Sequence, residues 1–288
     1  MRLDNGILSV EISEHGAEPV SIEKFSRQYL WNADTAFWNR HAPILFPAVG
    51  RMKDDGFTYE GRRFPMKQHG FVRDCRFVST GNPGELRLVE RPSADVYPFD
   101  FELSVRYRLE GNRLVAKWKV VNTGAGEMFF QIGAHPGFLL PDYDANDPVH
   151  GYLRFYDREG RETMPLVVSE LEDGLRVALH EPKAYLGESA FPITDTTFRN
   201  NALLFEGGQV VTVDLLDKQG ILVLRVDCPQ AEAFGIWAPY KPGCPFVCLE
   251  PWCGICDASD FYGSLPERKY IHRLGGGEEF EFEYGITI

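Results

Sequence analysis

The most constraining feature of this chain is an alternation of apolar and polar residues with a period of two, which recurs along most of its length. Successive side chains of a β-strand point to opposite faces of a sheet, so this alternation is typical of half-buried strands. Residues 101–109 alternate in this way and predict one strand. The sequence Glu110-Gly111-Asn112 after them predicts a turn into a second strand over 113–122. A hairpin follows, with one face of its first strand carrying Phe101, Leu103, Val105, Tyr107 and Leu109.

The same pattern predicts further strands, with Gly, Asn, Asp or Pro at most of the joints. They fall within residues 85–90, 202–226, 234–239, 246–252 and 278–288. Helical signals are short and confined to 34–41 and 257–267. We therefore expect an all-β fold, a large antiparallel β-sandwich with a few short helices, forming a single domain over residues 1–288.

Composition and charge narrow the class of protein. The chain has 288 residues, 44% hydrophobic and 25% charged, which is enough for a large core. Its formal net charge of −12 disfavours nucleic acids and anionic membranes as partners, because both require a basic face. The N-terminal stretch lacks a secretory pattern and no apolar run is long enough to span a bilayer, so we expect a cytoplasmic protein, a monomer or homodimer, with reduced cysteines.

One segment is basic, although the chain as a whole has a negative net charge. Residues 51–76 contain seven basic and four acidic side chains, a local excess of +3. This excess is either a solvated surface or a site for an anionic group. The basic residues are Arg51, Lys53, Arg62, Arg63, Lys67, Arg73 and Arg76.

Four short segments place polar side chains beside apolar runs interrupted by Gly or Pro, as expected where a rigid β-scaffold presents functional groups from strand ends. They are "APILFPAVGR" ending at Arg51, "MKQHGFVRD" with His69 and Arg73, "FFQIGAHPGFLLP" with His135, and "FVCLEPWCGICD" with Glu250.

His135 and Glu250 are the most informative of these residues. Pro136 favours extended geometry at His135, which places the imidazole at the end of a strand. Glu250 stands between apolar residues, so desolvation should raise its basicity and suit it to act as a general base. Both residues also have a structural interpretation, a hydrogen-bonded histidine and a salt-bridged glutamate.

The cysteines near the C-terminus allow a metal interpretation that the spacing does not favour. They form C-x3-C-x4-C-x2-C, whereas structural zinc sites usually separate two cysteine pairs by about 12 to 20 residues. We therefore expect core thiols and no metal. The four residues are Cys244, Cys248, Cys253 and Cys256.

The sequence lacks the motifs of several enzyme classes, namely a G-x-S-x-G elbow, an H-E-x-x-H helix, a Walker loop and a dinucleotide fingerprint. Two histidines, a carboxylate and arginines remain, a set that suits proton transfer on a neutral polar ligand. Nearby aromatic rings could stack on a sugar, and the candidates are Trp38, Phe46, Phe71, Phe138 and Trp252.

In order and spacing, "ILFPAVGRMKD", "MKQHGFVRD", "QIGAHPGF" and "IWAPYKPGCPFVCLEPWCGICD" resemble the aldose 1-epimerase (galactose mutarotase) family, most closely its LacX-like branch. The resemblance extends from about residue 3 to the C-terminus. It implies a galactose mutarotase-like supersandwich with an open sugar cleft and no required cofactor. It also implies an isomerase of carbohydrate metabolism that interconverts the anomers of a hexose or hexose phosphate.

The resemblance assigns roles residue by residue. His135 matches the acid that protonates the ring oxygen, and Glu250 matches the base that removes the proton of the anomeric hydroxyl. His69 and Arg51 match residues that bind sugar hydroxyls. For these roles the acid must be protonated and the base ionised near neutral pH, a state that two adjacent opposite charges favour. Arg73 and Trp252 complete the expected substrate-binding residues, with Arg73 or Lys67 as a possible phosphate clamp.

One departure from the family leaves a second function open. Where the family commonly has an aspartate that binds sugar hydroxyls, this chain has Asn201, with Asp195 a few residues upstream as a possible substitute. An asparagine hydrogen-bonds without charge. A non-catalytic carbohydrate-binding or sensing protein is therefore the alternative. A glycosidase or lyase ranks last, because a glycosidase requires two carboxylates and only Glu250 is clearly placed.

Overall fold

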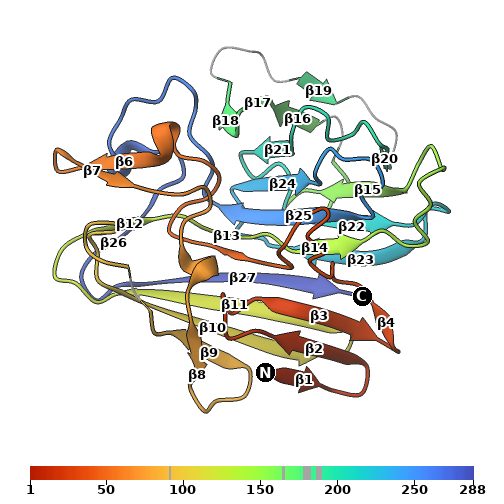
Figure 1. Ribbon diagram of the computed structural model, residues 1–288, viewed down its shortest axis with the longest axis horizontal. Helices are drawn as coiled ribbons and strands as arrows, with labels where there is room; N and C mark the ends of the chain where they lie inside the picture. The colour runs from red at the N-terminus through yellow and green to blue at the C-terminus, as the bar shows by residue number, and fades with distance from the viewer. Residues whose placement is uncertain (91, 164–165, 178–182, 186–189) are drawn as a thin grey trace.

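The computed structural model describes residues 1–90, 92–163, 166–177, 183–185 and 190–288, and it is an all-β structure (Figure 1). Within these ranges helix is limited to three short 3-10 helices, η1 (Lys53–Asp55), η2 (Val72–Asp74) and η3 (Leu265–Glu267).

Two large antiparallel sheets dominate the described residues. The nine-stranded sheet runs, in spatial order, β20 (Phe191–Ile193), β15 (Gly151–Tyr156), β22 (Thr212–Leu216), β23 (Leu222–Asp227), β27 (Glu279–Thr287), β11 (Arg113–Asn122), β10 (Phe101–Glu110), β9 (Glu85–Leu88) and β8 (Phe77–Ser79). The eight-stranded sheet runs β19 (Lys183–Tyr185), β16 (Leu166–Ser169), β21 (Leu203–Glu206), β24 (Ala233–Trp237), β25 (Phe246–Cys253), β13 (Ile132–Ala134) and β5 (Ile44–Leu45), with β14 (Gly137–Leu139) also paired to β25.

Smaller sheets surround these two (Figure 1). A four-stranded sheet contains β1 (Arg2–Asp4), β2 (Leu8–Ile12), β3 (Pro19–Lys24) and β4 (Arg27–Gln28). Three strand pairs are β6 (Gly56–Tyr59) with β7 (Arg62–Pro65), β12 (Met128–Phe130) with β26 (His272–Leu274), and β17 (Leu171–Glu172) with β18 (Leu175–Arg176).

The strands predicted from the alternation are confirmed. β10 and β11 form the expected hairpin, with Phe101 opposite Asn122, and every second residue from Phe101 to Tyr107 is buried. The segment 34–41 is a turn and not a helix. The Asp34 carbonyl accepts from Phe37 and Trp38 N–H at 3.0 Å each, but His41 N–H donates to the Glu18 carboxylate at 3.3 Å, outside the segment. In 257–267 helix is restricted to η3, which Ser264 and Glu267 cap reciprocally.

The two faces of the eight-stranded sheet have different environments. Val247 and Leu249 of β25 join the main hydrophobic core, which also contains residues of the nine-stranded sheet; Phe155 of β15 contacts Phe205 of β21 with ring centroids 5.1 Å apart. Trp252 alternates with them and belongs to a separate cluster on the opposite face. One face of this sheet therefore closes the sandwich, and the other is available for a site.

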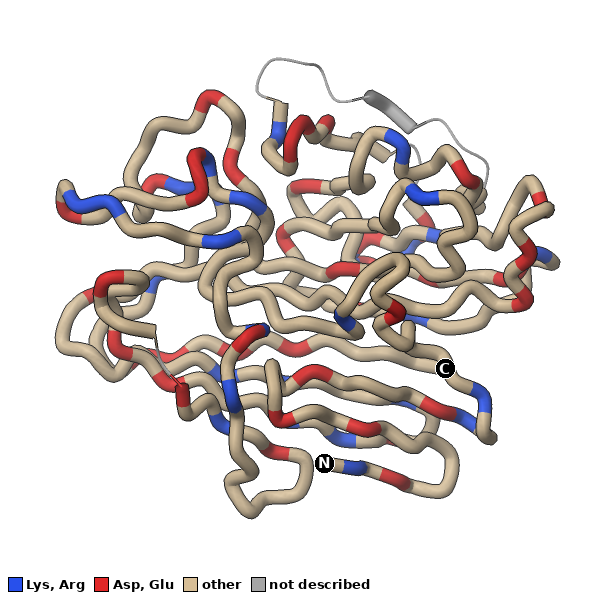
Figure 2. Tube along the Cα trace, in the orientation of Figure 1, with Lys and Arg blue, Asp and Glu red and all other residues tan. Residues whose placement is uncertain are grey.

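Four of the seven basic side chains of segment 51–76 are exposed, and two of the seven pair with acidic groups. Figure 2 shows basic and acidic positions interleaved in this part of the trace. Arg51 pairs with Asp55, and Arg62 pairs with Asp95. Most of the local excess is thus a solvated surface, as one of the two interpretations expected.

All six cysteines are free thiols, and four of them are buried: Cys228, Cys248, Cys253 and Cys256. Among the described residues there is no helix both long enough and apolar enough to cross a membrane.

Candidate functional site

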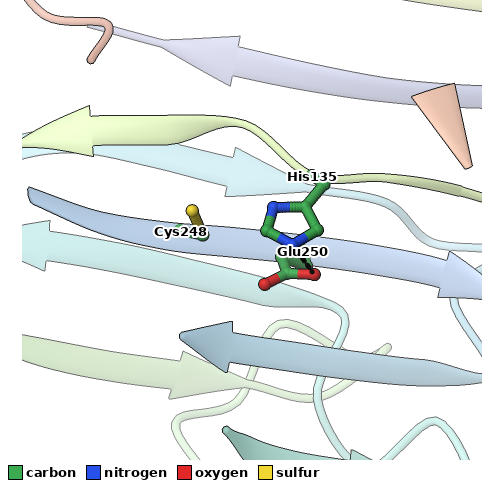
Figure 3. Close-up of side chains that lie close together, drawn as sticks. All are labelled: His135, Cys248 and Glu250. Atoms are coloured by element: carbon green, nitrogen blue, oxygen red, sulfur yellow. Dashed lines mark ion pairs between the residues drawn. The ribbon is translucent and has the colours of Figure 1, made fainter. Parts of the chain in front are cut away.

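Strand register places His135 directly opposite Glu250. β13 and β14 both pair with β25, with Gly133 opposite Trp252 and Gly137 opposite Cys248. His135 is midway between the two glycines and Glu250 midway between their partners, so the same antiparallel register brings them together. His135 Nε2 lies 3.1 Å from Glu250 Oε2, as the dashed line in Figure 3 marks.

The sequence around His135 explains why the imidazole is presented here. Pro136 has no N–H, so it cannot donate to the ladder, and the strand is interrupted between β13 and β14. The Pro136 carbonyl still accepts from Leu249 N–H at 3.1 Å, which keeps the interrupted segment attached to β25. His135 therefore leaves regular pairing without leaving the sheet.

Glycines create the space in which the large side chains of this face pack. A Cβ at Gly133 would lie 2.7 Å from Trp252 Cδ1, and one at Gly235 would lie 3.0 Å from Trp252 Cζ2. Gly235 is also the β24 partner of Glu250. The glycines beside β25 allow Trp252 to lie flat on the sheet next to the carboxylate.

Two tryptophans confine the His135 ring. Trp38 stacks on it with ring centroids 4.8 Å apart and an interplanar angle of 28°, and Trp237 meets it edge-on at 5.7 Å. Trp38 is positioned in turn by its carbonyl, which accepts from Trp31 Nε1 at 2.8 Å. The imidazole is therefore held in one orientation above the carboxylate.

His69 is oriented by hydrogen bonds with Gly50. Gly50 N–H donates to His69 Nδ1 at 3.1 Å, and His69 N–H donates to the Gly50 carbonyl at 2.9 Å. Burial and then the neighbouring His135 hold the pKa of His69 well below its usual value, so the ring is neutral. Since Nδ1 accepts, the proton is on Nε2, which lies 3.5 Å from the side-chain nitrogen of Gln68 and can donate to a ligand.

A cavity of about 340 Å³ opens over these residues. Ligand sites of small molecules usually begin at about 300 Å³, so this volume suits one small ring. Seven of the residues singled out from the sequence line it: Trp38, His69, Arg73, His135, Asn201, Glu250 and Trp252. The cavity thus brings together residues up to 214 positions apart in the chain, the span from Trp38 to Trp252.

Four buried polar atoms around the cavity have no hydrogen-bond partner among the described residues. They are Arg73 Nε, His135 Nδ1, Trp252 Nε1 and Glu250 Oε2, the last close to His135 but not aligned for a hydrogen bond. Buried polar groups are normally satisfied, so this concentration is a mark of a site that binds a polar ligand.

Arg51 is directed away from the cavity, in contrast to Arg73. Its guanidinium pairs with Asp55 at 2.8 Å and Asp173 at 2.5 Å, and its stem lies behind Gly174, where a Cβ would meet it at 3.5 Å. The cavity lining includes Gly174 but not Arg51. Direct hydroxyl binding by Arg51, as the resemblance implied, is not what this geometry favours.

Asn201 lines the cavity, whereas Asp195 does not. The Asn201 side-chain oxygen accepts from Ala202 N–H at 2.8 Å. Asp195 is bound to His150, with Oδ1 2.9 Å from Nε2, and both line a different, smaller cavity. The suggestion that Asp195 substitutes for the family aspartate is therefore wrong in this structure.

Two of the five aromatic candidates, Trp38 and Trp252, line the cavity. Phe46 and Phe138 are fully buried core residues, and Phe71 packs against the same core. Trp237 and Gln68 line the cavity as well and were missed. Gln68 could have been predicted, because it is adjacent to His69 in a segment already singled out. Trp237 could be placed in the cavity only once the β24–β25 register was known.

Burial determines the protonation of the His135–Glu250 pair. It lowers the pKa of His135 to about 3, and Arg73 and Arg40 add to that direction. Burial also raises the pKa of Glu250 well above its usual value, although the indole N–H of Trp252 acts in the opposite direction and lowers it. The pair is thus favoured as a neutral pair with one transferable proton, and not as the ion pair expected from the sequence, because desolvation outweighs the mutual attraction.

Two groups of side chains have the donors that metals prefer. His135, Cys248 and Glu250 offer ligand atoms that all lie within 4.8 Å of one another (Figure 3). The same holds for Glu232, Cys253 and His272, at the end of β25. No cluster formed by Cys244, Cys248, Cys253 and Cys256 together is found among the described residues.

Two large antiparallel sheets packed as a sandwich are the fold of galactose mutarotase-like proteins. The family model described as aldose 1-epimerase matches residues 1–254, and the chain belongs to that family. The membership predicted from the four motifs is confirmed.

Known relatives agree with this result. The plasmid-encoded protein LacX of Lactococcus lactis subsp. lactis is 27% identical over 300 residues, covering 100% of this chain and 99% of the relative. A galactose mutarotase related enzyme from Lactobacillus acidophilus has a structure that matches with a TM-score of 0.88 at 30% identity, covering 100% of this chain and 96% of that one.

A galactose mutarotase-like protein from Lactobacillus casei matches in fold with a TM-score of 0.89 at 24% identity, over 100% of this chain and 99% of the other. The predicted fold class is thereby confirmed, and the match to LacX agrees with the predicted branch of the family.

Proposed function

We propose that this protein is an aldose 1-epimerase that interconverts the α and β anomers of an aldose or aldose phosphate by acid/base ring opening. The observation that carries the proposal is the His135–Glu250 pair, a buried imidazole and carboxyl group 3.1 Å apart beside a cavity that fits one small ring. Family membership supports a sugar as the substrate.

The proposed reaction needs two proton transfers and no covalent intermediate. Glu250 takes the proton of the O1 hydroxyl while His135 delivers one to O5, so the C1–O5 bond breaks and the open-chain aldehyde forms. Rotation about C1–C2 presents the other face of the carbonyl. The reverse transfers close the ring as the opposite anomer and return the pair to its starting protonation.

One proton within the pair is sufficient for this cycle. Moving it from Glu250 to His135 converts the neutral pair into the ion pair that the forward step uses. Hydrogen bonds from sugar hydroxyls to the carboxylate would favour its ionised form and so assist that transfer. We assign His69, through its Nε2–H, to a ligand oxygen, and Trp252 and Trp237 to the apolar face of the ring.

The direct test is the rate of anomer interconversion of fresh α-glucose or α-galactose, followed by polarimetry or exchange NMR. We expect the purified protein to accelerate it over buffer. Saturable sugar binding without acceleration would contradict the proposed activity and favour the alternative, a carbohydrate-binding or sensing protein.

The pH profile of kcat/KM should be broad. The pKa of His135 is lowered from 6.5 to about 3, so the pair takes up a second proton only in strongly acidic solution. The pKa of Glu250 is raised, so the pair loses its proton only above the usual range of a carboxyl group. Activity should therefore persist below pH 6.5, and an acid limb centred near that value would contradict a neutral pair.

Arg73 supports phosphorylated sugars as substrates. It lines the cavity, its buried Nε has no partner among the described residues, and its Nη2 donates to the Gln68 carbonyl at 2.8 Å. If it binds a phosphate, Arg73→Gln should raise KM for glucose 6-phosphate by about 10- to 100-fold, since a charge-assisted hydrogen bond contributes about 1.5–3 kcal/mol.

The matched control is Lys67→Gln, which removes the other clamp candidate; Lys67 is exposed and outside the cavity lining. It should leave KM for both sugars unchanged. An equal rise of KM for glucose and glucose 6-phosphate in Arg73→Gln would show that Arg73 does not bind a phosphate.

A further inference from the structure

A second group of side chains with metal-binding atoms lies outside the cavity and consists of Glu232, Cys253 and His272. Cys253 is the last residue of β25, His272 is the first of β26, and Glu232 immediately precedes β24. Their ligand atoms all lie within 4.8 Å of one another, and His272 Nε2 is 3.2 Å from Glu232 Oε2.

Backbone pairing holds the three residues in place. Cys253 is the strand partner of Ile132, and His272 is the partner of Phe130, two residues earlier on the same segment. Glu232 N–H donates to the Trp252 carbonyl at 2.9 Å, next to Cys253. The group is therefore built on adjoining strands and not on independent loops, which favours a defined geometry.

The donor set is that of a zinc site. A thiolate, an imidazole nitrogen and a carboxylate oxygen are the three ligand types that Zn²⁺ takes, at about 2.3, 2.0–2.1 and 2.0–2.2 Å. Around a tetrahedral ion such ligands lie about 3.3 to 3.6 Å apart. The His272–Glu232 pair is already close to that spacing, and no pair of the three ligand atoms is more than 4.8 Å apart.

The group of Glu232, Cys253 and His272 is more accessible to an ion from solvent than the group at the cavity. The His272 and Glu232 side chains are 21% and 29% exposed, so an ion can enter from solvent and retain a water as fourth ligand. His135 and Glu250 are almost fully buried and lie near Arg73 and Arg40, which repel a cation.

We propose that Glu232, Cys253 and His272 bind a zinc ion, at a site distinct from the sugar cavity. The Cys253 thiol donates to the Gln230 carbonyl at 3.4 Å. On binding, the thiol releases its proton to solvent as the sulfur–zinc bond forms, and the imidazole coordinates through Nε2 with its proton on Nδ1. The basic group nearby, Arg158, is engaged with the Ala231 carbonyl.

The test is titration of the full-length, metal-free protein with Co²⁺, which takes the same ligands as zinc and reports a bound thiolate by a charge-transfer absorption band. We expect one equivalent to bind with this band, Zn²⁺ to displace it, and Zn²⁺ to raise the midpoint of thermal unfolding. Absence of the band in the wild type would overturn the proposal.

Variants locate the ion. Cys253→Ala should abolish the band, and Glu232→Gln and His272→Gln should weaken binding by more than about 100-fold, since losing even an outer partner of a ligand costs about 10- to 100-fold. The latter two side chains are partly exposed, so these variants test the site even if Cys253→Ala does not fold.

The matched control is Cys248→Ala, which removes the thiol of the other cluster and should leave the band unchanged. A band that is lost in Cys248→Ala and retained in Cys253→Ala would place the ion beside His135 and Glu250, and would refute the proposed site.

Discussion

Replacing Glu250 with Gln, or His135 with Asn, is expected to slow anomer interconversion by about 10²- to 10⁴-fold, the usual contribution of a positioned acid or base. Each variant keeps the shape of the side chain and removes its ability to exchange a proton. Initial rates by polarimetry, with the buffer rate subtracted, measure the effect.

The double variant separates a cooperating pair from two independent groups. If His135 and Glu250 exchange one proton as a unit, the double variant should be little slower than either single one. Multiplicative losses would indicate that the two groups act separately. Unchanged rates in both single variants, against an active wild type, would refute the proposed roles.

Matched substitutions outside the cavity serve as controls for these variants. His150→Asn removes another buried histidine, and Glu279→Gln removes an exposed carboxylate paired with Lys119. Neither residue lines the cavity, so activity should stay close to that of the wild type. Thermal unfolding of all variants shows whether any loss of rate reflects loss of the fold.

Gly133→Ala is expected to combine a loss of stability with a loss of activity. The added Cβ would lie 2.7 Å from Trp252 Cδ1, closer than real Cβ contacts, so the indole must move. Overpacking of this kind costs about 1–3 kcal/mol of unfolding free energy, which urea denaturation can measure. Because Trp252 lines the cavity beside Glu250, mutarotation should fall as well.

Gly126→Ala is the matched control, because a Cβ there meets nothing within 4 Å. It should leave both the unfolding free energy and the activity almost unchanged. A Gly133→Ala protein as stable and as active as Gly126→Ala would show that Trp252 has room to move and that its position is not critical.

Much of the fold could be predicted because strand formation depends on local pattern. The alternation in 101–122 predicted the β10–β11 hairpin and its buried face. The segment 34–41 was predicted less well, because Asp34 starts a turn with the same hydrogen bonds that begin a helix. Local sequence signals therefore do not distinguish an isolated turn from the first turn of a helix.

The candidate site was predictable where its residues carry their own signal. His135 stands before a proline, and Glu250 stands in an apolar strand, so both could be singled out from neighbouring residues. Arg51 and Arg73 belong to one basic segment and look alike in sequence. Only the folded chain turns Arg51 toward Asp173 and leaves Arg73 in the cavity.

The sequence by itself determined the all-β class and most strands, and it singled out His135 and Glu250 as candidates, because periodicity and proline act over a few residues. The tertiary structure alone decided the register that sets His135 opposite Glu250, the inclusion of Trp237, and the neutral state of the pair. These depend on contacts between distant segments and on the exclusion of water, which arise only when the sheets pack.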